Sequence, residues 1–214
     1  LFGIALTSAV AAGVIMAAIP AAVALLSWLF LGERIARRVA FGIACAMAGI
    51  ALLAFTRQPE VTSAATAATA ASLWLGNALL LGAVLCEASY VVIGKRLTAS
   101  VSAKRISAIV NLWGLVLVTP FGVWMALSFD FGAVTPAMWG LLLFYALAAS
   151  MVTVWLWMTG LRHVPAASAG VYSVMLPISA AAIGVFVLGE PFGSSHATAF
   201  VLAIAGVVLA TRRD

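Results

Sequence analysis

The chain has 214 residues, of which 65% are hydrophobic and only 8% are charged, and its mean hydropathy is +1.21. Soluble domains carry about 25% charged residues, so this composition excludes a water-soluble domain, a disordered chain and a nucleic-acid-binding protein. It predicts an integral membrane protein. Since one span of about 20 residues and its turn use roughly 30 residues, the length allows about seven helices.

Seven apolar segments follow one another along the chain, bounded by charged or Pro/Gly-rich turns. They are continuous and rich in Ala, Leu and Gly, which excludes the apolar/polar alternation of a transmembrane β-barrel. Helices are the remaining way to satisfy the backbone in lipid. We therefore predict an all-α integral membrane bundle with spans over residues 9–31, 38–56, 73–94, 106–128, 138–160, 166–188 and 195–211.

The basic residues predict the orientation of these spans. Ten of the eleven Lys and Arg residues fall on one side of the predicted membrane, and only Arg57 falls on the other. By the positive-inside bias, that side and the C-terminus are cytoplasmic, so we expect a multi-pass protein of the cell (inner) membrane. The net charge of +5 then reflects topology. The ten residues are Arg34, Arg37, Arg38, Lys95, Arg96, Lys104, Arg105, Arg162, Arg212 and Arg213.

A shift of 157 residues superimposes two parts of the sequence without gaps, with 13 identities between residues 12–52 and 169–209. Glu33 ends its span on the predicted cytoplasmic side, whereas Glu190 ends its span on the outer side. The two copies are therefore inverted, which is a recurring architecture of secondary transporters. The matches include Gly13 with Gly170, Pro20 with Pro177, Leu31-Gly32-Glu33 with Leu188-Gly189-Glu190, and Gly49 with Gly206.

The repeat predicts the division of the chain. Residues 1–56 are the C-terminal part of a first repeat, the low-complexity stretch 57–72 is a linker on the outer side, and residues 73–214 are the second repeat. The second copy begins near Leu73. Leu1 aligns with Met158, which lies 85 residues after Leu73, so the first copy lacks the part that corresponds to these 85 residues. We therefore expect the chain to be N-terminally truncated, and its first residue, Leu rather than Met, agrees with this.

The chain resembles the EamA family of the drug/metabolite transporter superfamily. The resemblance rests on a mid-span Pro, then Leu-Gly-Glu at the helix end, then a small-residue helix with Gly, once in each half; residues 167–177 (ASAGVYSVMLP) are also similar to the ninth helix of that family. It implies ten helices in two inverted five-helix repeats, of which this chain supplies helices four to ten. It also implies cytoplasmic termini and the export of small metabolites such as amino acids.

Glu87 is the one ionisable residue that lies well inside a predicted span. A carboxylate at that depth is costly and is a functional candidate by default. It lies on a helix face with small and polar residues, so we expect it to line a cavity as a proton-coupling group or a counter-ion for an amine. The alternative is a protonated Glu87 that hydrogen-bonds a neighbouring helix. The other residues of this face are Gly76, Leu80, Ala83, Tyr90 and Gly94.

Polar side chains on three further spans are candidates for a substrate pocket. They share helix faces with other polar or small residues, and each has the alternative of an interhelical hydrogen bond or ordinary packing. The resemblance favours Tyr90 at its position but not Glu87, which would be a feature of a subgroup. The candidates for substrate or coupling roles are Glu87, Tyr90, Asn111, Thr153, Trp157, Ser168 and Tyr172.

Two prolines and two Gly-Glu pairs complete the candidate residues. Pro20 and Pro177 lie near mid-span and should leave the carbonyls of Met16 and Ser173 without their usual helical donors, which suits a hinge or a substrate contact as well as a structural kink. Gly32 and Gly189 suit helix C-termini. Glu33 and Glu190 are then structural residues at opposite membrane faces.

These features predict a secondary active transporter that exports a small zwitterionic or cationic metabolite by alternating access. Alternatives are a drug or nucleotide-sugar transporter and a structural or lipid-binding membrane subunit. The sequence has no nucleotide-binding or hydrolase motif, so we expect no enzyme, no cofactor and no metal site. The expected partners are the bilayer, a small-molecule substrate and a coupling proton, and a homo-oligomer is compatible with these features.

Overall fold

The long apolar runs form helices throughout. The structure, a computed structural model, describes residues 3, 6–7, 9–56, 70–189 and 193–211. Within these residues, seven helical segments are long and apolar enough to cross a membrane, and each overlaps one predicted span, which confirms the all-α membrane fold. They are Ala11–Leu31, Arg37–Phe55, Leu73–Leu97, Ala103–Ala126, Pro136–Leu161, Ala166–Val187 and Ser194–Thr211.

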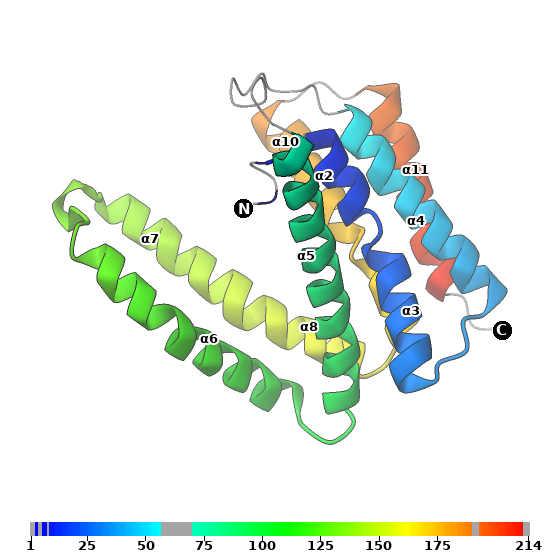
Figure 1. Cartoon of the computed structure of the whole chain (residues 1–214), viewed down its shortest axis with the longest axis horizontal. Coiled ribbons are helices and arrows are strands. Elements are labelled where there is room, and N and C mark those ends of the chain that lie inside the picture. The colour runs from blue at the N-terminus through cyan, green and yellow to red at the C-terminus, as the bar shows by residue number, and fades with distance from the viewer. Residues whose placement is uncertain (1–2, 4–5, 8, 57–69, 190–192, 212–214) are drawn as a thin grey trace. The chain divides into compact units, whose positions relative to one another are not determined.

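Several of these spans consist of more than one helix (Figure 1). The chain groups into two compact units, residues 1–93 with 165–214 (unit 1) and residues 94–164 (unit 2). The predicted linker 57–72 lies mostly outside the described residues. In chain order the elements are α2 (Ala9–Met16), α3 (Ile19–Leu31), α4 (Arg37–Thr56), α5 (Ala70–Leu97), α6 (Ala103–Ala126), η2 (Phe131–Ala133), α7 (Pro136–Tyr145), η3 (Ala146–Val152), α8 (Thr153–Leu161), α9 (Ala166–Tyr172), α10 (Met175–Leu188) and α11 (Ser194–Thr211).

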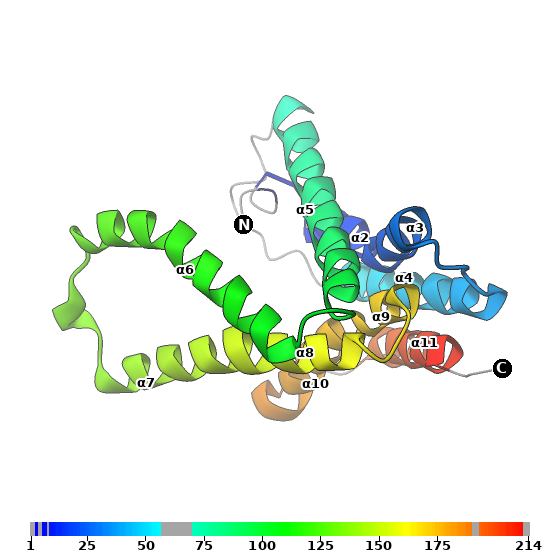
Figure 2. The ribbon, with the colours of Figure 1, turned by 90° about the horizontal axis from the view of Figure 1, so that it is seen from below.

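The core of unit 1 is built on small residues. Helices α4 and α11 lie side by side and form the most extensive helix pair (Figures 1 and 2). In lipid, the hydrophobic effect does not drive helices together. Small side chains favour association there because they let the helix backbones approach closely and pack. Helices α3 and α9 complete this core, whose buried members are Ala24, Val39, Ile43, Ala46, Ala167, Val171, Val174, Ala203 and Ala210.

The contacts between α4 and α11 are arranged as the inverted repeat requires. A methyl group added at Gly42 would come within 2.8 Å of the Gly206 carbonyl oxygen. The 157-residue shift converts this pair into Ala199 and Gly49, and a methyl group added at Gly49 would lie 2.9 Å from the Ala199 carbonyl oxygen. The same backbone contact therefore occurs twice along the helix pair, about two helical turns apart.

The two spans that contain the paired prolines are both broken. In the first span, α2 ends at Met16 and α3 begins at Ile19, so Pro20 is in the first turn of a new helix, where its missing N–H costs little. In the sixth span, α9 ends at Tyr172 and α10 begins at Met175. These breaks lie at nearly equivalent positions of the repeat.

The Ser173 carbonyl lacks its usual helical donor, because residue 177 is a proline without an N–H. The carbonyl is nevertheless not free, since the N–H of Leu176 donates to it at 3.1 Å. At the break, the N–H three residues further on donates to the carbonyl instead of the N–H four residues further on. This satisfies the Ser173 carbonyl, to which Pro177 has no N–H to donate.

Gly32 and Gly189 end α3 and α10 in the left-handed conformation, with φ of 66° and 70°. Their N–H groups donate to the carbonyls of Ser27 and Gly184, which closes each helix. Only glycine adopts this conformation at no steric cost, since a Cβ would crowd the next carbonyl. Glu190, the partner of Glu33, lies outside the described residues.

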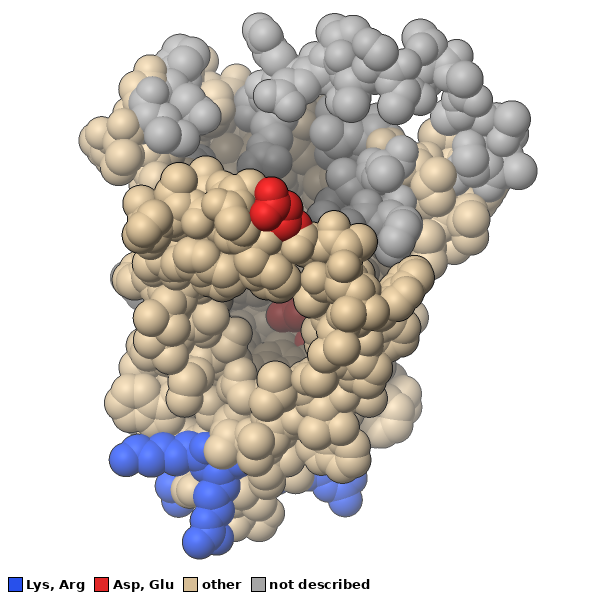
Figure 3. All heavy atoms as spheres, turned by 90° about the vertical axis from the view of Figure 1, so that its left-hand side faces the viewer, with Lys and Arg blue, Asp and Glu red and all other residues tan. Residues whose placement is uncertain are grey.

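Unit 2 is a long helical hairpin in which α6 contacts α8 and η3 (Figure 2). At one end, Lys95 of α5 donates from Nζ to the carbonyls of Leu161 and Arg162 at 3.0 and 3.1 Å and so satisfies the end of α8. At the other end, Asp130 accepts from the N–H of Gly132 at 2.9 Å. Basic side chains gather at one end of the face drawn in Figure 3, and a single acidic side chain lies toward the other end.

Candidate functional site

Glu87 lies deep within the span Leu73–Leu97, 14 residues from one end and 10 from the other. At 1.5 Å per residue, these distances correspond to about 21 and 15 Å. Its side chain is exposed rather than enclosed by the described residues. A carboxylate at such depth costs about 3 kcal/mol when it faces hydrocarbon, which favours water or polar partners over lipid around it.

The face of α5 that was predicted to line a cavity is buried in one part and exposed in another. Gly76 and Leu80 are buried, and a methyl group added at Gly76 would lie 2.9 Å from the Leu6 Cβ. Next to Gly76, the Thr7 hydroxyl donates to the Asn77 Oδ1 at 2.9 Å. This part of α5 packs against the N-terminal segment, whereas Ala83 and Glu87 are exposed and Tyr90, one turn further on, is half-buried.

Asn111 of α6 joins the two arms of unit 2. Its Nδ2 donates to the carbonyls of Ser107 and Ser150, both at 2.8 Å. Ser150 belongs to η3, a π-helix of seven residues. A π-helix bonds each N–H to the carbonyl five residues back and is frequent at functional sites. Asn111 therefore holds a carbonyl of an irregular segment and brings together two of the polar faces expected to form a pocket.

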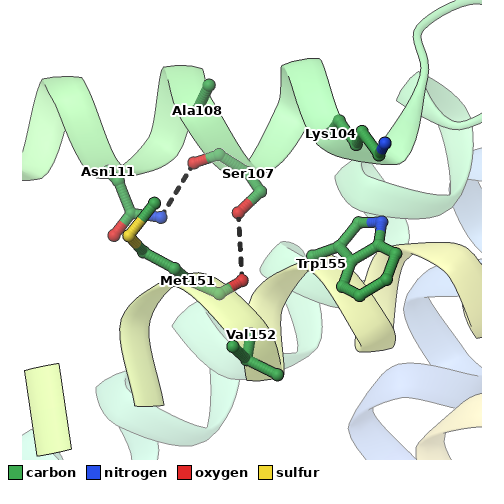
Figure 4. Close-up of a pocket in the computed structure, with 7 residues that line it drawn as sticks. All are labelled: Lys104, Ser107, Ala108, Asn111, Met151, Val152 and Trp155. Atoms are coloured by element: carbon green, nitrogen blue, oxygen red, sulfur yellow. Dashed lines mark hydrogen bonds between the residues drawn. The ribbon is translucent and has the colours of Figure 1, made fainter. Parts of the chain in front are cut away.

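Two more side chains satisfy the carbonyls of this π-helix. The Ser107 hydroxyl donates to the Met151 carbonyl at 3.4 Å (Figure 4). The Thr153 hydroxyl donates to the Ala148 carbonyl at 2.8 Å. Thr153 is exposed and hydrogen-bonds within its own segment, so its hydroxyl does not meet Asn111.

A cavity of about 280 Å³ lies between α6 and the segment formed by η3 and α8. Figure 4 shows it, with Asn111 and Ser107 toward one end and Lys104 and Trp155 toward the other. The middle of the cavity is apolar. Its lining residues are Lys104, Ser107, Ala108, Asn111, Met151, Val152 and Trp155.

Trp157 of α8 has a buried indole Nε1 that finds no acceptor among the described residues. A buried N–H without a partner costs about 1 to 3 kcal/mol. Trp157 is not among the residues that line the cavity described above.

The remaining candidates, Ser168 and Tyr172, belong to α9 in unit 1. Ser168 is buried and Tyr172 is half-buried at the last residue of the helix, directly before the break that precedes α10. Unit 1 therefore holds Glu87, Tyr90, Ser168 and Tyr172, whereas unit 2 holds Asn111, Thr153 and Trp157.

Glu33 does more than follow a helix end. Its carboxylate accepts hydrogen bonds from the N–H groups of Ala166 and Ala167, at 3.0 and 3.2 Å. These are the first two residues of α9, so Glu33 caps a helix that lies more than 130 residues further along the chain. A carboxylate at a helix N-terminus satisfies unpaired donors and matches the helix dipole.

Sequence reasoning missed both the π-helix and the place of Lys104 in the lining of the cavity. The stretch ALAASMV has ordinary helical character, and its irregular hydrogen bonding depends on side chains of another helix. Lys104 did carry a usable signal, because residues 104, 107, 108 and 111 follow the i, i+3, i+4, i+7 spacing of one helix face.

Comparison with known proteins adds to this geometry. The sequence pattern of the EamA-like transporter family matches residues 1–55 and 74–212. The chain is 30% identical over 207 residues to the "Uncharacterized transporter YetK" of Bacillus subtilis (strain 168), covering 97% of this chain and 61% of that protein. It is 29% identical over 134 residues to the "Uncharacterized transporter YwfM" of the same organism, covering 63% of this chain and 44% of that protein.

A solved structure has the same fold. It is described only as "Crystal structure of protein" and superimposes with a TM-score of 0.74 at 19% identity, covering 94% of this chain and 67% of that one. The chain thus spans about three fifths of the length of its first curated relative and two thirds of the structural one.

Proposed function

Since the chain belongs to the EamA-like transporter family, we propose that it is part of a secondary active transporter that exports a small zwitterionic or cationic metabolite, such as an amino acid. Its seven membrane-crossing segments make it a multi-pass membrane protein. The protein would lie in the cell membrane, with the basic ends of its spans and its C-terminus on the cytoplasmic side.

The observation that carries this proposal is the pair of equivalent contacts between α4 and α11, Gly42 with Gly206 and Gly49 with Ala199. Inverted repeats of this kind recur in transporters that alternate between two access states. The broken spans α2/α3 and α9/α10 support the same mechanism, because such transporters place their sites at discontinuous helices.

Glu87 would carry the charge of the site. An exposed carboxylate deep in a span attracts an amine or exchanges a proton with the solution. The half-buried side chain of Tyr90 is one turn away on the same helix, α5.

The test is transport by the full-length protein in proteoliposomes, with a panel of amino acids and with or without a pH gradient. We expect flux that a pH gradient accelerates, and we expect Glu87→Gln to reduce the rate at least about tenfold, as loss of a charge-assisted hydrogen bond of 1.5 kcal/mol or more would.

Asp130→Asn is the matched control. It also removes a carboxylate, but Asn can still accept from the Gly132 N–H at this turn, so flux should not change. Glu87→Gln with the rate and pH dependence of wild type would refute the role of Glu87. No flux of any tested solute under any gradient would instead favour a structural membrane subunit.

A further inference from the structure

The cavity between α6 and the η3/α8 segment does not suit the substrate proposed above. The donors of Asn111 are already used by two backbone carbonyls, and the Ser107 hydroxyl is used by a third. The one charged group in the lining is Lys104, which has no hydrogen bond or ion pair with another described residue. A cationic or zwitterionic amine would meet a like charge here.

The surroundings of Lys104 favour an anion. It is the second residue of α6, and the hydroxyl of Ser102, the N-cap, makes no capping hydrogen bond. The N–H groups at a helix N-terminus attract negative charge. Unit 2 also carries other basic residues at this end, whereas Asp130 lies at the opposite end. These basic residues are Lys95, Arg96, Arg105 and Arg162.

The rest of the cavity favours a hydrocarbon chain. From Lys104 it extends along the membrane-crossing helices past Ala108, Val152 and Trp155, and it offers no further charge. Its charged end is thus at the start of an apolar span, where a phospholipid has its phosphate, and its apolar part runs in the direction of the acyl chains. Basic pockets between membrane helices are known sites for anionic lipid headgroups.

We propose that this cavity binds an anionic phospholipid of the surrounding bilayer, with the phosphate at Lys104 and an acyl chain between α6 and α8. The lipid would hold the two arms of unit 2 together where Asn111 and Ser107 already join them. It is a resident partner of the protein and not the transported solute.

The experiment measures quenching of Trp155 by lipids brominated on one acyl chain. The full-length protein is placed in phosphatidylcholine vesicles that contain brominated phosphatidylglycerol or, in parallel, brominated phosphatidylcholine. Fluorescence of Trp155→Phe, measured in the same vesicles, is subtracted to isolate the signal of Trp155. We expect the anionic lipid to quench this signal at a lower mole fraction than the zwitterionic lipid.

Variants assign the effect to the cavity. Lys104→Gln should weaken the apparent affinity for phosphatidylglycerol about fivefold, the equivalent of one basic residue near anionic lipid. Arg105→Gln, the adjacent charge that does not line the cavity, should change it much less. Ala108→Phe should block the acyl chain, whereas Ile109→Phe, at an exposed neighbouring position outside the lining, should not. Lys104→Arg should retain binding if Lys104→Gln does not fold.

Three outcomes would overturn the proposal. Equal quenching by both lipids would mean that the anionic headgroup is not recognised. Equal effects of Lys104→Gln and Arg105→Gln would mean that only the general surface charge matters. Loss of quenching on addition of inorganic phosphate or glycerol phosphate would assign the site to a soluble anion instead of a lipid.

Discussion

Gly32 shows how much can depend on one backbone angle. Its φ of 66° is strained for any residue with a Cβ, although the space around it is open. We predict that Gly32→Ala lowers the free energy of unfolding by about 1 kcal/mol, whereas Gly32→Asn lowers it less because Asn tolerates this conformation. Gly189→Ala should match Gly32→Ala, since φ there is 70°. Thermal unfolding of the full-length protein in detergent measures these changes, and an unchanged melting temperature for both Ala variants would contradict the prediction.

Glu33 stabilises a helix to which it does not belong. Removal of its carboxylate leaves the N–H groups of Ala166 and Ala167 without an acceptor at a buried helix start. We predict that Glu33→Ala lowers the free energy of unfolding by about 1 to 2 kcal/mol, the usual cost of losing an N-terminal cap. Glu33→Gln should have a smaller effect, because its amide oxygen still accepts one hydrogen bond.

Amide hydrogen exchange over α9 gives the direct measurement for Glu33. Exchange at Ala166 and Ala167 should accelerate in Glu33→Ala, whereas exchange in α6 should not. Uniform acceleration throughout the protein would show that the variant loses global stability without any specific effect on α9.

The π-helix η3 is the element whose stability depends most on a neighbour. Asn111 contributes one hydrogen bond to the Ser150 carbonyl. We predict that Asn111→Ala lowers the free energy of unfolding by about 1 kcal/mol and accelerates amide exchange over residues 146–155. Thr119→Ala is the control, because Thr119 lies on the same helix and bonds only the Leu115 carbonyl. Equal exchange over η3 in both variants would exclude this role of Asn111.

The sequence predicted the seven spans, and its mid-span prolines pointed to the interruptions of the first and sixth, but it did not predict the π-helix in the fifth. Hydropathy depends on composition over about 20 residues, so it locates each span to within a few residues. The π-helix and the cap of Glu33 on α9 depend on contacts between residues 39 or more apart in the chain. Local sequence contains no record of such contacts, although the shift of 157 did identify which glycines and prolines are equivalent.

Among the candidate site residues, the sequence identified Asn111, and the structure joins it to the Ser150 carbonyl of the next span by a hydrogen bond. It did not indicate that the Asn111 side-chain amide is occupied by this bond and so is not available to a ligand. Nor did it indicate that Lys104 is the charged residue in the lining of the cavity. Whether a polar side chain is available to a ligand depends on its partners, which pattern and spacing alone do not specify.

At the scale of the whole molecule, the paired contacts of α4 and α11 can be tested for equivalence. A methyl group at Gly206 would lie 2.7 Å from the Gly42 carbonyl oxygen, so Gly206→Ala must push the helices apart. We predict a loss of about 1 to 3 kcal/mol in the free energy of unfolding, typical of overpacking, and a similar loss for Gly49→Ala. Gly114→Ala of α6, which has open space, should be neutral or stabilising. A large loss for only one of the α4/α11 variants would show that the contacts are not equivalent.

The recurrence of one contact at two levels of the α4/α11 pair also bears on energetics. Two conformations that are related by exchange of the repeats would keep these contacts at the same free energy, so they would cancel from the difference between the conformations. The free-energy difference between the two conformations then depends on positions where the copies differ. One such position is Val23, which packs beside Gly170 and aligns with Ala180 of the other copy. Substitutions at unmatched positions are therefore the ones that would tilt the resting equilibrium, while matched substitutions in both copies would change stability and leave that equilibrium unchanged.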